Sequence, residues 1–90
     1  MRIVVSYDIP DDTRRLKMAA LLKSYGERVQ LSVFEAELNP YQLKNMLGKV
    51  RELMEPEDSV RVYLLGKDWK KRTLTLGQAT PLSFPEDDVI

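Results

Sequence analysis

The chain has 90 residues, of which 43% are apolar, so its length and composition suit one small globular domain. It contains no cysteine and no histidine, which excludes disulfides, thiolate metal sites and cysteine nucleophiles and leaves acid–base chemistry to carboxylates, to a lysine or tyrosine of shifted pKa, or to metal-bound water. The net charge is zero, but three of the 14 acidic side chains lie within residues 81–90. Residues 1–80 therefore contain 14 basic and 11 acidic side chains. This mildly basic body permits nucleic-acid binding. Because no signal peptide or membrane-length apolar run is evident, we expect a cytoplasmic protein.

The first third of the chain predicts a strand followed by a helix. Residues 2–7 read as a strand in which Ile3, Val4 and Val5 are apolar on both faces, which is typical of a central strand covered on both sides. Asp8 then lies at the C-terminal end of this strand, and Asp11 or Asp12 can cap the following helix. Apolar residues at helical spacing predict that helix over 12–25, and Gly26 suits the position just after its end.

The segment 27–38 changes its apolar phase near residues 32–34. Odd positions are apolar before this point and even positions after it. A strand with one buried face keeps one parity, so we expect a short strand at 28–31 and a longer one at 33–38, with a bulge or bend as the alternative.

The second half predicts a helix and two strands. Asn39 is the expected N-cap of the helix, with Pro40 at its first position and Gln42 completing a capping box. Alternating residues predict a strand at 59–66 and a short one at 73–76, with a basic turn between them. The order β-α-β-β-α-β indicates an α+β, ferredoxin-like domain with an appended strand over 1–78, and a loosely ordered acidic tail over 79–90. The appended strand could pair with the sheet edge of a partner subunit.

Asp8 is the leading candidate for chemistry, because sheets of this kind present ligand groups at strand ends. One carboxylate per chain suffices for Mg²⁺ if a two-fold axis brings two copies together, and the implied reaction is metal-assisted phosphodiester hydrolysis. The structural alternative is an Asx turn that leads into the helix.

Basic side chains suggest contacts to phosphate, although a solvated charged surface explains them as well. Arg14 and Arg15 lie in the first turns of the first helix, where positive charge opposes the helix dipole. The other expected contacts to nucleic acid are Tyr7, which offers an aromatic face, and the basic residues Arg28, Lys70, Lys71 and Arg72. We place Phe34 in the core or at a subunit interface, and Leu74 and Leu76 of the appended strand at the interface.

Two sequence blocks resemble the small CRISPR-associated endonucleases of spacer acquisition. The first is Tyr7-Asp8-Ile9 followed by Asp11-Asp12 and Arg14-Arg15, and the second is residues 26–30 followed by residues 32–35. The resemblance covers residues 1 to about 76; leucine at position 31 departs from its pattern.

The resemblance implies a ferredoxin-like homodimer with packed sheets, in which Asp8 of each chain binds Mg²⁺ or Mn²⁺. It implies cleavage of single-stranded RNA or double-stranded DNA, and a complex with a CRISPR integrase dimer in which this chain is a scaffold for DNA. A non-catalytic DNA-binding scaffold therefore stays as the alternative to the endonuclease, and an unrelated ferredoxin-like dimer that binds a small ligand as a third interpretation.

Overall fold

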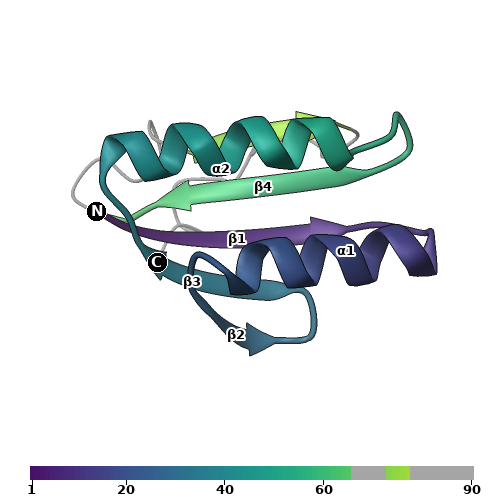
Figure 1. Ribbon diagram of the computed structural model, residues 1–90, viewed down its shortest axis with the longest axis horizontal. Helices are drawn as coiled ribbons and strands as arrows, with labels where there is room; N and C mark the ends of the chain where they lie inside the picture. The colour runs from purple at the N-terminus through teal and green to yellow at the C-terminus, as the bar shows by residue number, and fades with distance from the viewer. Residues whose placement is uncertain (66–72, 78–90) are drawn as a thin grey trace, which may run out of the picture.

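The computed structural model describes residues 1–65 and 73–77, and for 73–75 only the backbone. They form one antiparallel sheet with two helices, in the order β1 (Arg2–Asp8), α1 (Asp12–Lys23), β2 (Glu27–Gln30), β3 (Val33–Glu37), α2 (Pro40–Leu53), β4 (Ser59–Leu64) and β5 (Thr73–Gly77). The strand order across the sheet is β2-β3-β1-β4-β5 (Figure 1). The first four strands have the ferredoxin-like arrangement, which confirms the predicted fold class.

Local capping determines where the helices begin. The Asp11 side chain accepts a hydrogen bond of 2.8 Å from the Arg14 amide at the start of α1. At the start of α2, Asn39 and Gln42 form the predicted capping box, with bonds of 2.8 and 2.9 Å. Gly48, within α2, has open space where a side chain would begin. Neither helix in the described residues is long and apolar enough to cross a membrane.

The sheet has two unlike faces. Ile3, Val5 and Tyr7 of β1 point to one face, where they pack with buried residues of both helices, including Met18 and Met46, in a single core. We call this the covered face. The opposite face, which we call the open face, contains Val4, Ser6 and Asp8 of β1 together with their register partners Val33, Glu35, Ser59, Arg61 and Tyr63. Both helices pack on the covered face, so the expectation that β1 is covered on both sides is wrong for the described part of this chain.

The phase change in 27–38 is a hairpin. The strands β2 and β3 are joined through Leu31 and Ser32, and their register shifts between Arg28 and Gln30. The prediction of two strands with a tight connection is confirmed. Gly26 is not a left-handed helix end, since its φ is not positive; a side chain there would collide with the Glu35 carbonyl and the Ala36 Cβ, so glycine permits close approach of the chain to β3.

The appended strand β5 pairs with β4 of its own chain. Five residue pairs from Ser59–Gly77 to Tyr63–Thr73 connect the two strands. This corrects the suggestion that a partner's sheet edge is needed, because β4 itself is the edge next to β1 and accepts the strand. The tail over 79–90 and the whole basic turn over 67–72 lie outside the described residues.

Candidate metal and nucleic-acid site

Asp8 is an exposed carboxylate at the end of β1, on the open face and opposite Ser59. Within residues 1–65 and 73–77 its side chain has no hydrogen bond or ion pair. The helix that follows is capped by Asp11 instead, so nothing in the described residues supports the Asx-turn alternative for Asp8. An exposed carboxylate is a hard oxygen donor that suits Mg²⁺ or Mn²⁺. The described side chains contain no group of three or more acidic residues that could hold a metal, so among them Asp8 is not part of a larger carboxylate cluster.

A second aspartate, Asp58, lies just before β4 and is buried, whereas Asp8 is exposed. Asp58 immediately precedes Ser59 and has no exposed surface. Its carboxylate accepts bonds of 2.6 and 2.9 Å from the Arg14 guanidinium and one of 3.0 Å from the Glu55 amide. The bond from Arg14 is the main reason why the pKa of Asp58 is lowered, and burial opposes it.

Arg14 is therefore engaged inside the protein. Its side chain is 16% exposed and also contacts Glu57 at 2.7 Å. The bond to Asp58 raises the pKa of Arg14 above its ordinary value. Since its Nε and Nη2 donors already bind carboxylates, the structure favours a role for Arg14 in connecting α1 to the start of β4, over the phosphate contact that we expected. Sequence reasoning missed Asp58, which lies 44 residues from Arg14 and belongs to no local motif.

Arg15 holds the loop between β1 and α1. Its guanidinium donates to the Ile9 carbonyl at 3.0 Å and forms an ion pair with Asp12. The side chain remains 44% exposed, so a phosphate can still approach it.

Tyr7 and Phe34 form an aromatic pair inside the covered face. The ring centroids are 6.2 Å apart with an interplanar angle of 25°, and the residues are 5% and 2% exposed. Neither ring is accessible for base stacking or for a second subunit. The expected roles of Tyr7 as a stacking surface and of Phe34 as an interface residue are therefore corrected to core packing, which is the alternative that we had kept open for Phe34.

Arg28 lies above this pair and is exposed. Its guanidinium carbon is 5.4 Å from the centroid of the Phe34 ring, within the range of a cation–π contact. No carboxylate in the described residues pairs with it. Among the expected nucleic-acid residues that the structure describes, Arg28 is thus the one whose charge is most available to an anion.

The remaining predicted residues divide between the core and the part outside the structure. Leu76 packs partly buried against the core of its own chain. Lys70, Lys71 and Arg72 lie outside the described residues, as does the side chain of Leu74. Their expected contacts stay predictions.

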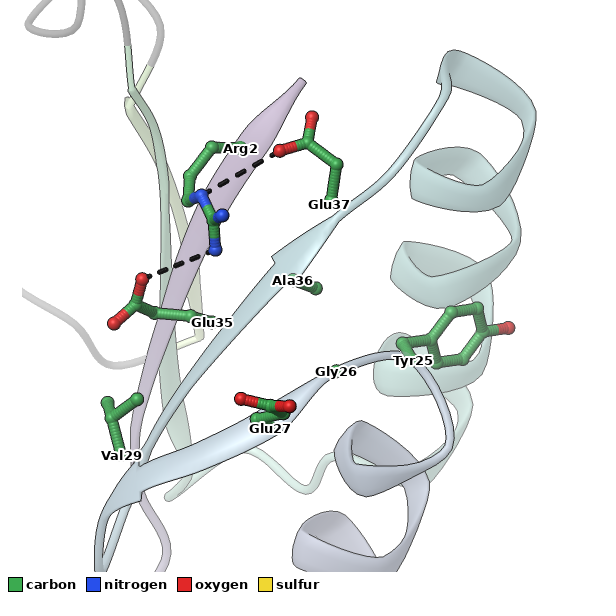
Figure 2. Close-up of a pocket in the computed structure, with 8 residues that line it drawn as sticks. All are labelled: Arg2, Tyr25, Gly26, Glu27, Val29, Glu35, Ala36 and Glu37. Carbon is green, nitrogen blue, oxygen red and sulfur yellow. Dashed lines mark hydrogen bonds and ion pairs between the residues drawn. The ribbon is translucent and has the colours of Figure 1, made fainter.

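A cavity of about 400 Å³ lies at the other end of the sheet and is lined by acidic residues (Figure 2). Arg2 lies between Glu35 and Glu37, at 3.5 and 3.7 Å. The N-terminal amino group is 2.9 Å from Glu37, and the hydrogen bond between them is the main reason why the pKa of Glu37 is lowered. Arg2, which lines this cavity, is about 20 Å from Asp8 along β1, from the strand rise over six residues. Two of its carboxylates already have cationic partners, so it does not resemble the Asp8 end.

Comparison with known proteins identifies the family. Residues 1–73 match the family model for CRISPR associated protein Cas2. CRISPR-associated endonuclease Cas2 2 of Thermus thermophilus is 57% identical over 60 residues, which are 66% of this chain and 67% of that protein. CRISPR-associated endoribonuclease Cas2 3 of Synechocystis is 42% identical over 88 residues, 97% of this chain and 95% of that protein.

Solved structures agree with these sequence matches. The crystal structure of Streptococcus pyogenes Cas2 superposes with a TM-score of 0.68 at 36% identity, covering 86% of this chain and all of that one. A chain from a partial Cas6-RT-Cas1–Cas2 complex gives a TM-score of 0.65 at 32% identity, covering 78% of this chain and 83% of that one. The match to the family model includes the strand end that carries Asp8, and the chain belongs to the Cas2 family of CRISPR-associated proteins.

Proposed function

We propose that this chain is a divalent-metal-dependent endonuclease subunit of CRISPR spacer acquisition, which acts as a homodimer on phosphodiester bonds of RNA or duplex DNA. The observation that carries the proposal is the exposed Asp8 carboxylate, which has no partner among the described residues at the end of a strand. The relatives from Thermus and Synechocystis are named an endonuclease and an endoribonuclease. With no histidine or cysteine in the chain, a carboxylate with its metal is the simplest means to hydrolyse a phosphodiester.

The open face supports association with a second copy. Val4 lies between Glu35 and Tyr63 in the register of the sheet, and all three are half-buried although no helix of the described residues covers them. Two such faces can pack about 10 Å apart, as stacked sheets do. Because Asp8 belongs to the same face, a two-fold axis near this strand end would bring two carboxylates together.

In this proposal Asp8 of each copy would hold the metal, and the chain's cations would position the substrate. A bound Mg²⁺ or Mn²⁺ would lower the pKa of its water and stabilise charge on the phosphate. Arg28, with the basic turn Lys70, Lys71 and Arg72, would bind phosphates on either side of the scissile bond. Arg15 would keep the loop after Asp8 in place through the Ile9 carbonyl.

The test replaces Asp8 with Asn and measures cleavage of single-stranded RNA and duplex DNA with and without Mg²⁺. We expect the metal-dependent cleavage to be lost while the fold is retained. Glu27→Gln is the matched control, because Glu27 is also exposed but lines the distant acidic cavity. Cleavage by Asp8→Asn at the rate of the unmodified chain would reject the endonuclease proposal.

The homodimer has a separate test. Val4→Arg places a charge in the open face and is expected to dissociate the dimer in sedimentation velocity. Tyr41→Arg is the control, because Tyr41 is 82% exposed on α2 and away from this face. If Val4→Arg leaves the sedimentation coefficient unchanged, the open face is not the interface.

A non-catalytic scaffold is the second candidate. Asp8 alone is a small set of catalytic groups for one chain, because no larger carboxylate cluster is present in the described residues. The internal bond of Arg14 to Asp58 also makes that cation less available to a phosphate. The chain's likeness to the Cas2 of a complex with Cas1 supports binding to that integrase. If Asp8→Asn preserves spacer acquisition in cells while charge reversal at Lys70, Lys71 and Arg72 abolishes it, the scaffold explains the function.

A further inference from the structure

A groove between α1 and the β2–β3 connection is unlike the rest of the described surface. It has a volume of about 340 Å³ and is lined by Tyr7, Arg15, Leu16, Ala19, Arg28, Leu31 and Ser32. We call it the cationic groove, because two arginines and no acidic residue line it. Leu16 and Leu31 are 71% and 85% exposed, the largest exposures among the exposed aliphatic side chains of the described residues.

The charge of the groove is uneven. The Arg15 guanidinium is partly neutralised by Asp12 outside the lining. Arg28 rests on the Phe34 ring and has no carboxylate partner in residues 1–65. A ligand for this groove therefore needs an anion for Arg28 and apolar groups for the two leucines.

The C-terminal segment of this chain has that composition. Residues 81–90 contain Glu86, Asp87 and Asp88 and no basic residue. They also contain four large apolar side chains, Leu82, Phe84, Val89 and Ile90. Acidic and apolar residues in one short segment complement arginines and leucines in one groove.

The segment is long enough to reach the groove. Gly77 pairs with Ser59, which pairs with Asp8, so β5 ends at the same end of the sheet as Tyr7 and the β2–β3 connection (Figure 1). Three strand spacings, about 15 Å, separate β5 from β3. Residues 78–86 can span about 30 Å when extended, which also allows a path around the edge of the sheet to α1.

We propose that the acidic segment 81–90 docks into the cationic groove of its own chain and competes there with nucleic acid. The competition rests on the proposed function, whereas the docking does not. The carboxylates of residues 86–88 would face Arg28, where a phosphate would otherwise bind. The segment would thus lower the affinity with which the free protein binds nucleic acid non-specifically.

Docking is tested in the full chain by paramagnetic relaxation enhancement. The chain has no cysteine, so Ser83→Cys gives a single position for a nitroxide label. We expect loss of amide signals in residues 15–19 and 28–32, and recovery of those signals with Arg28→Glu or with the triple variant Glu86→Gln, Asp87→Asn, Asp88→Asn. Lys44→Glu, which reverses an exposed charge on α2, should leave the loss unchanged. Equal loss over α2, or no loss at the groove, would overturn the docking.

Mixed samples and binding data complete the test. In the mixed sample, one set of chains carries the nitroxide but no ¹⁵N, and the other set carries ¹⁵N but no nitroxide. If the nitroxide chains broaden the groove signals of the ¹⁵N chains, the segment docks on another copy and the proposal is wrong. Fluorescence anisotropy with a duplex oligonucleotide measures the competition. The triple variant should bind up to about fivefold more tightly than the unmodified chain, which corresponds to the loss of one exposed ion pair. This gain should vanish when Arg28→Ala is also present. A gain that persists there overturns the competition. If no variant binds nucleic acid, the proposed function fails while the relaxation result still decides the docking.

Discussion

The covered and open faces of the sheet use the same residue types for opposite purposes. On the covered face Asp58 is buried and receives bonds from Arg14 and Glu55, and no buried side-chain polar atom in the described residues is left without a partner. On the open face Asp8, paired in register with the residue after Asp58, is exposed and has no such bond. The difference shows that burial and hydrogen-bond partners, and not the residue type, distinguish an aspartate inside the fold from one whose carboxylate stays exposed.

The comparison is tested most strongly by Phe34→Ala on the covered face. Phe34 is buried and supports both Tyr7 and Arg28. Loss of a buried phenylalanine should lower the free energy of unfolding by about 3–5 kcal/mol. Urea denaturation measures this, with Leu31→Ala as the exposed control, for which we expect little change. Similar values for the two variants would show that Phe34 is not a core residue.

The next largest effect is expected for Asp58→Asn. The change removes the charge of a buried carboxylate that accepts two bonds from Arg14, whereas Arg14 is 16% exposed and keeps its contact to Glu57. The free energy of unfolding should fall by about 1.5–3 kcal/mol, as for lost hydrogen bonds to a charged group. Urea denaturation of Asp8→Asn provides the comparison from the open face. Equal destabilisation by the two substitutions would contradict the distinction between the faces.

Acid titration isolates the charge of Asp58. Its pKa is lowered in the folded protein, chiefly by Arg14, so the unfolded chain binds more protons as the pH falls. The stabilisation is therefore complete above the ordinary aspartate pKa of about 4 and is lost as the pH falls through the lower, folded value. Unfolding measured between about pH 5 and 2 should be less pH-dependent in Asp58→Asn, while the contribution of Glu37 persists. An unchanged slope would show that folding does not lower the pKa of Asp58.

The smallest effect on stability is expected at Asp8. Because the side chain is exposed and has no described partner, Asp8→Asn should change the free energy of unfolding by less than about 0.5 kcal/mol. If Asp8 holds the metal as proposed, we expect millimolar Mn²⁺ to raise the melting temperature of the unmodified protein and Asp8→Asn to abolish that rise. A large loss of stability without metal would assign Asp8 to the fold and not to a ligand site.

The features that were predicted correctly are those that depend on residues close together in the sequence. The capping box of α2 needs residues 39 and 42 only, and the hairpin was visible because residues 27–38 change parity. Asp8 could be placed because a strand end and a helix start both follow from short patterns.

Contacts between distant residues could not be predicted in this way. The bond between Arg14 and Asp58 joins residues 44 positions apart, and neither residue carries a local sign of its partner. The burial of Tyr7 and Phe34 depends on how the hairpin packs on α1. The pairing of β5 depends on which sheet edge is closer after folding, and a one-dimensional pattern contains no such distance.

Gly48 is a position at which the stability of this protein can be increased by substitution. The position is within α2, and an added methyl group would meet no atom within 4 Å beyond the neighbouring backbone of its own helix. Alanine favours a helix interior over glycine by about 1 kcal/mol, so a Gly48→Ala background would tolerate damaging substitutions elsewhere without altering either face of the sheet. Variants too unstable to purify in the native chain could then be produced and their chemistry studied.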